Sequence, residues 1–139
     1  MRFLIAALPL CLLPIALAEP AGALPGTIAV LQGLDKITAR VSTFEAPLDQ
    51  PVRFGSLQIV ARACDKKPPE ETPESTAFLE ITDVRPDSPS VELFKGWMFA
   101  SSPAVSALEH PVYDVWVVDC KNATAGAAEG APAAAGQGQ

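Results

Sequence analysis

The sequence predicts a mostly β domain, a small antiparallel β-sandwich or partly open barrel of about six strands with one short helix and one disulfide. Three observations lead to this fold class. Apolar and polar side chains alternate along several short segments, as they do in half-buried strands. Turns that contain proline or glycine separate these segments, and no segment has the apolar period of a long amphipathic helix.

The first two expected strands are short. Residues 28–34 form an apolar run, and residues 37–43 alternate in polarity. This alternation places Ile37, Ala39 and Val41 on one face, which we expect to be buried.

The middle of the chain predicts two further strands. Residues 52–64 read as one long strand, and Gly55 inside it predicts a bulge or a close backbone contact. The next strand places Ala77, Leu79 and Ile81 on its inner face.

Two strands and a helical turn complete the domain. The strands cover residues 91–100 and 112–120, and the second is apolar on both faces near its middle, which predicts a central place in the sheet. Between them, Ser102 can cap a short helix over residues 104–108, because Pro103 suits the first helical position. Pro111 ends that helix.

Both ends of the chain differ from this domain. Residues 1–18 have the pattern of a signal peptide, with Arg2 before an apolar run and Ala16 and Ala18 at the cleavage site. A membrane anchor and lipidation at Cys11 are the alternatives. We expect a linker over residues 19–25, the β domain over 26–121, a disordered tail over 122–139, and a periplasmic protein without a membrane span after cleavage.

Cys64 and Cys120 are expected to form a disulfide, because two cysteines of an exported domain meet oxidising conditions. A redox pair is the first alternative, but the Cys-x-x-Cys spacing is absent. Zinc held by both cysteines and His110 is the second, and these ligands lack paired spacing. We therefore predict no metal and no cofactor.

The chain has 139 residues and a formal net charge of −6. This acidic balance argues against nucleic acid as a partner, because binding phosphates needs clustered lysine and arginine. Residues 65–76 hold three prolines and four acids, and we interpret them as a solvated loop between strands. A calcium site or a docking loop are the alternatives.

Aromatic residues gather in the last third of the chain, and most of them are expected in the core. Some are predicted to line an interface or groove, where aromatic anchors are enriched. The residues expected at this surface are Trp97, Phe99, Pro103, Glu109, His110 and Tyr113.

No catalytic residues are predicted. A serine hydrolase would draw on Ser101, Ser102 or Ser106 with His110 and Asp114, but the turn that exposes such a nucleophile is missing. The expected function is therefore binding of a protein partner in the envelope or inner membrane. A soluble envelope protein that binds a glycan or small ligand between Trp97 and Tyr113 is a second hypothesis.

Residues 94–120 (FKGWMFASSPAVSALEHPVYDVWVVDC) resemble the bacterial family called domain of unknown function 2155. Residues 34–47, 54–64 and 68–81 match the rest of that pattern. The resemblance implies a small exported domain of Gram-negative bacteria and assigns no catalytic residue. It also implies a link with an accessory subunit on the periplasmic face of the proton-pumping NADH:quinone oxidoreductase.

Overall fold

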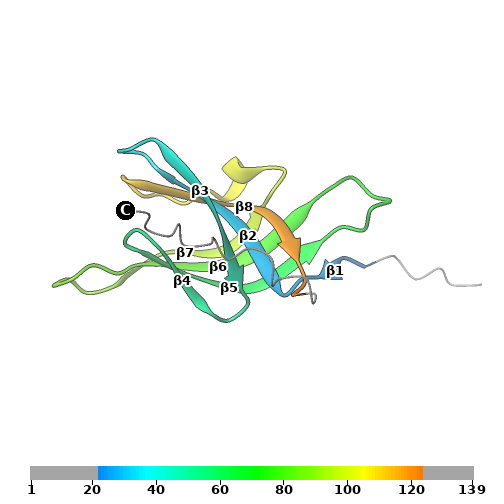
Figure 1. Ribbon diagram of the computed structural model, residues 1–139, viewed down its shortest axis with the longest axis horizontal. Helices are drawn as coiled ribbons and strands as arrows, with labels where there is room; N and C mark the ends of the chain where they lie inside the picture. The colour runs from blue at the N-terminus through cyan, green and yellow to red at the C-terminus, as the bar shows by residue number, and fades with distance from the viewer. Residues whose placement is uncertain (1–21, 124–139) are drawn as a thin grey trace, which may run out of the picture.

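The computed structural model describes residues 22–123 and confirms a mostly β fold of two antiparallel sheets (Figure 1). The first sheet has the order β1-β5-β6-β7 with β4 also paired to β5, and the second has the order β3-β2-β8. The strands are β1 (Leu24–Pro25), β2 (Ile28–Asp35), β3 (Arg40–Pro47), β4 (Pro51–Phe54), β5 (Leu57–Lys66), β6 (Ser75–Asp83), β7 (Val91–Phe99) and β8 (Tyr113–Lys121).

The predicted signal peptide and nearly all of the predicted tail lie outside the described residues. β1 falls in the segment predicted as a linker and pairs with the end of β5. Within residues 22–123, no helix is long and apolar enough to cross a membrane.

The core lies between the two sheets. Along β6, Ala77, Leu79 and Ile81 are fully buried, which confirms the predicted inner face. They belong to one cluster with Leu31 of β2 and Val117 of β8. Each large side chain buried in this way stabilises the fold by about 1.5–3 kcal/mol.

The strand predicted over residues 37–43 is confirmed from Arg40 onward, but its start and its buried face are wrong. β3 begins only at Arg40, and Ile37 and Val41 are 77% and 56% exposed. The carboxylate of Asp35 accepts the amide hydrogens of Ile37 and Thr38 and so holds a tight turn. This turn lies at the tip of the β2–β3 hairpin, away from the buried cluster, so the alternation has no core to face.

The segment predicted as one strand from residue 52 is a hairpin of β4 and β5. Gly55 lies in its turn with a φ of +58°, a left-handed conformation that glycine adopts without strain. A Cβ at this position would lie 2.3 Å from the ring of Tyr113. Gly55 is therefore a turn residue in close contact with a ring, and the expected bulge in a continuous strand does not form.

β8 was expected at the centre of a sheet, but it is an edge strand that pairs only with β2 among the described residues. On its second apolar face, Trp116 is half-buried and lines a small cavity with Pro103 and Ala107 of the crossover that follows β7, while Val118 is exposed. The expected helix in this crossover is shorter than predicted. It is a 3₁₀ helix, η1 (Pro103–Ser106), and the Ser102 side chain does not cap it.

A bulge in β8 brings Cys120 to the inner face. Val30 lies opposite Asp119 but the next residue, Leu31, lies opposite Val117, so Val118 is the extra residue. Strict alternation would turn Asp119 inward and Cys120 outward. With the bulge, Cys120 is 3% exposed and faces β5.

The predicted disulfide joins Cys64 of β5 to Cys120 of β8, with Cα atoms 5.8 Å apart. It links one sheet to the other. The chain also crosses between the sheets beside it, because the Gly26 amide donates to the Cys64 carbonyl at 2.7 Å. A Cβ on Gly26 would lie 3.2 Å from the Cys120 Cβ, so a side chain there has little room.

Candidate functional site

A groove of about 520 Å³ lies beside the disulfide. The loop between β5 and β6, which lines it, is at the end of the ribbon opposite the β2–β3 and β6–β7 hairpin tips (Figure 1). The loop between β5 and β6 forms one wall, and β8 with the residues just after β7 forms the other. Its apolar lining residues are Pro68, Pro69, Pro73, Ala100 and Val118.

The loop wall is held by its own backbone. The strands run further than predicted, so the connecting loop covers only residues 67–74. The Lys67 amide donates to the Glu74 carbonyl at 2.9 Å, and the Glu71 amide donates to the Pro68 carbonyl at 3.0 Å. With three prolines between them, these bonds give the loop few alternative conformations.

Glu74 ties the loop to the opposite wall. One carboxylate oxygen accepts the amide hydrogens of Ser75 at 3.1 Å and Ser101 at 3.0 Å, and the other bonds to the Ser101 hydroxyl. The Ser101 hydroxyl and amide hold the pKa of Glu74 below its ordinary value, against the opposing effect of burial. The ionised carboxylate therefore fixes the spacing between the two walls.

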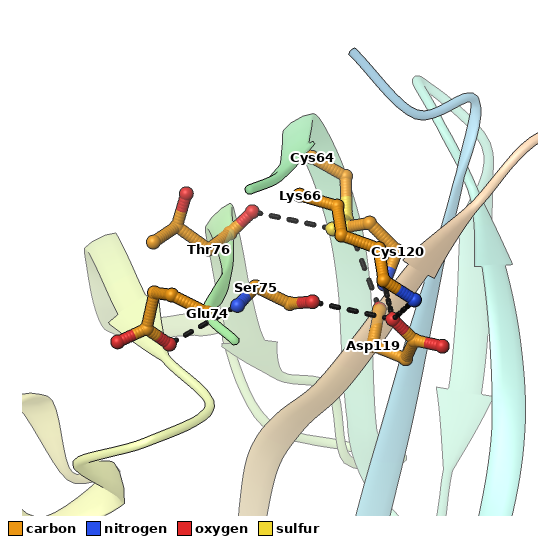
Figure 2. Close-up of a disulfide and its surroundings, with 7 residues drawn as sticks. All are labelled: Cys64, Lys66, Glu74, Ser75, Thr76, Asp119 and Cys120. Carbon is orange, nitrogen blue, oxygen red and sulfur yellow. Dashed lines mark hydrogen bonds and ion pairs between the residues drawn. A yellow bond between two sulfur atoms is a disulfide. The ribbon is translucent and has the colours of Figure 1, made fainter. Parts of the chain in front are cut away.

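Asp119 is the second anchor of the groove. One of its oxygens accepts hydrogen bonds from Lys66 Nζ at 2.7 Å, the buried Ser75 hydroxyl at 3.2 Å and the Cys120 amide at 2.8 Å. Figure 2 shows these donors converging on Asp119 beside the disulfide. Burial opposes ionisation, but Lys66 and the Cys120 amide outweigh it and lower the Asp119 pKa.

The geometry bears on two metal sites considered from the sequence, zinc at the cysteines and calcium in the acidic loop. Both cysteine sulfurs are in the disulfide, so they cannot form the zinc site considered with His110. Among residues 22–123, no group of three or more His, Cys, Asp or Glu side chains could hold a metal ion. In the acidic loop, the Glu74 carboxylate is occupied by Ser75 and Ser101.

The residues predicted as one contact surface lie in different places. Trp97 and Phe99 are on the outer face of the first sheet, where Trp97 is 42% exposed and packs edge-on against Phe78 at 5.5 Å. Pro103 and Glu109 are exposed in the crossover. Tyr113, which was expected to line a groove with Trp97, packs edge-on against Phe54 at 5.5 Å.

His110 is buried, although it was predicted at an interface. Its Nδ1 accepts the amide hydrogens of Val112 and Tyr113, both at 3.1 Å, and its ring stacks on Tyr113 at 5.3 Å. Its Nε2 faces a carboxylate oxygen of Asp83 at 3.6 Å. The imidazole thus organises the start of β8, and only 9% of the residue is exposed.

The serine hydrolase alternative required a serine hydroxyl against His110, with Asp114 behind it. The His110 nitrogens instead face two backbone amides and Asp83. The Ser101 hydroxyl bonds to Glu74 on the other side of the crossover. The trio that this alternative requires does not assemble among the described residues.

Two features were missed at the sequence level. The groove depends on Val118, Ser101 and Glu74, which only the sheet pairing brings together; the one available signal was the unusual proline content of residues 68–73. Asp83 was not among the predicted site residues, yet its side chain is 4% exposed and pairs with Arg85. A lone Asp at the end of an apolar strand gives no sign of this pairing.

Comparison with known proteins supports one family. A family model described as "Uncharacterized protein conserved in bacteria (DUF2155)" matches residues 29–120. A relative from Rickettsia prowazekii (strain Madrid E), itself described as uncharacterized, is 31% identical over 87 residues. These cover 63% of this chain and 56% of the relative, so the match spans little more than half of that protein. No solved structure matches the chain. The matched region contains the whole sandwich except β1, the first residue of β2 and the last residue of β8, and the chain belongs to the family named domain of unknown function 2155.

Proposed function

We propose that the chain is a non-enzymatic periplasmic β module that binds a protein partner through the groove beside the disulfide. The observation that carries the proposal is the way in which the groove is built. Apolar residues of both walls line it, and the walls are fixed to each other by Glu74, Asp119 and the disulfide. A preformed apolar surface of this kind loses little conformational entropy when a partner binds.

The sequence of residues 1–18 and the disulfide support the periplasmic part of this proposal. Residues 1–18 have the signal-peptide pattern, and a disulfide between two buried cysteines suits an oxidising compartment. In its most specific form, the partner is an inner-membrane respiratory complex, the NADH:quinone oxidoreductase, and the chain is an accessory subunit on its periplasmic face. This specific form is supported by the association with such an accessory subunit that the family resemblance implies.

The test is affinity purification of the tagged full chain from detergent-solubilised envelope of a bacterium that carries a family member. Val118→Lys places a charge in the groove, and Val41→Lys makes the same change at an exposed position on the β2–β3 hairpin. We expect a stoichiometric partner with the wild type and with Val41→Lys, and a loss of at least about tenfold with Val118→Lys. Recovery of no stoichiometric partner, or equal recovery with both variants, contradicts the proposal.

A further inference from the structure

We infer that the partner segment entering this groove is an extended, basic stretch in which lysine or arginine alternates with apolar residues. This inference rests on the proposed function and specifies the chemistry of the ligand. It follows from three properties of the groove: an edge strand in one wall, a fixed apolar anchor, and a surplus of carboxylates.

The edge strand favours an extended ligand. β8 pairs only with β2 within the described part of the chain, so its other edge has no strand partner, and its residues Val118 and Asp119 line the groove. A strand edge offers backbone donors and acceptors that an extended peptide can pair with. The opposite wall is rich in proline, which has no N–H. That wall offers few donors to the backbone carbonyls of the ligand, which are therefore left free to pair with β8.

Val118 supplies the apolar anchor. It is the extra residue of the bulge, and it is 39% exposed although it follows the buried Val117. The residues after it are fixed, because Asp119 bonds to Lys66 and Ser75, and Cys120 is in the disulfide. An apolar side chain held in this way can pack against an apolar residue of an extended chain, whose neighbouring side chains then point away because they alternate in direction.

The charge of the groove selects the other residues of the ligand. The loop and walls carry four carboxylates, those of Glu70, Glu71, Glu74 and Asp119, against Lys66 and Lys67. Lys66 pairs with Asp119 and Lys67 with Glu71, so the surplus is negative, as is the whole chain at −6. A cationic segment therefore gains from the field of the groove as well as from its walls.

The experiment uses two short synthetic peptides of equal length, one alternating lysine with valine and one alternating glutamate with valine. Binding to the full chain is measured by fluorescence anisotropy, and the site by amide NMR shifts. Glu71→Lys reverses a charge at the groove, and Glu92→Lys makes the same change on β7, away from it. We expect the lysine peptide to shift the amides of Ser75, Ala100 and Val118, to bind about fivefold more weakly to Glu71→Lys, and to weaken as salt rises.

Equal binding of both peptides, unchanged affinity with Glu71→Lys, or amide shifts outside the groove would overturn the inference. Self-association of the chain through Val118, seen by sedimentation, would overturn it as well, because the groove would then hold a second copy. These failures are distinguishable from failure of the proposed function. If Val118→Lys loses the envelope partner while the lysine peptide does not bind, the function stands and the basic ligand does not.

Discussion

Removing the disulfide should cost this domain a large part of its stability. Cys64 and Cys120 are separated by 56 residues, and the chain-entropy model gives ~4 kcal/mol for closing a loop of that length. In a domain of this size, each kcal/mol corresponds to about 4–8 °C, so the melting temperature should fall by roughly 15–30 °C. We expect this fall on reduction and in the double variant Cys64→Ala, Cys120→Ala.

The assay is urea unfolding of the protein starting at Glu19, followed by tryptophan fluorescence, for the oxidised protein, the reduced protein and the double variant. The double variant is the control, because a reductant should not change its unfolding curve. Coincident curves for the oxidised and reduced wild type would contradict the predicted loss, since the constraint that the disulfide puts on the unfolded chain would then contribute nothing to stability.

Hydrogen exchange should locate the loss. The Gly26 amide bonds to the Cys64 carbonyl at 2.7 Å, and the Thr27 amide bonds to the Lys121 carbonyl at 3.0 Å. These two bonds hold the crossing between the sheets directly beside the disulfide. Their protection should fall before that of the β6 amides on reduction, and an equal loss along the whole chain would show that the disulfide does not act on this crossing.

Three further changes test other parts of the structure. Asp83 has a pKa lowered from 3.8 to about 2, first by its hydrogen bond with Arg85 and then by Ser56, so its contribution is complete above pH 4 and is lost as the pH falls toward 2. Because Arg85 is largely exposed, this contribution to the unfolding free energy is at most about 2 kcal/mol. Asp83→Asn should remove it, so the unfolding free energy from urea titrations should depend less on pH between 4 and 2. The same pH dependence in wild type and variant would contradict the role of Asp83. Gly33→Ala places a Cβ 2.6 Å from the Phe54 ring and should destabilise the fold by about 1–3 kcal/mol. Adding Phe54→Leu should restore part of the lost stability in thermal melts, and no recovery would mean that the clash with Phe54 is not the cause. Ile37→Ser should change the unfolding free energy by less than about 0.5 kcal/mol, because the side chain is 77% exposed, and a larger loss would mean that the hairpin tip is covered in solution.

Local patterns predicted the parts of the fold that depend on neighbours in sequence. The alternation around Leu79 identifies a half-buried strand because successive side chains of a strand point to opposite faces. The same rule failed for Ile37, since alternation states which residues share a face and does not state whether another sheet covers it. Gly55 was expected to mark a bulge or a close contact, but a bulge and a turn can both require the positive φ that glycine adopts without strain.

The mostly β class, the pairing of Cys64 with Cys120 and the family could all be predicted from the sequence. A short pattern was enough in each case, or the two cysteines that lie outside the predicted signal peptide. The edge position of β8, the bulge at Val118 and the groove became visible only in the folded chain. These depend on contacts such as Glu74 with Ser101 and Ser75 with Asp119, whose partners are 27 and 44 residues apart. Their meeting follows from sheet register, which many residues set together and no local pattern records.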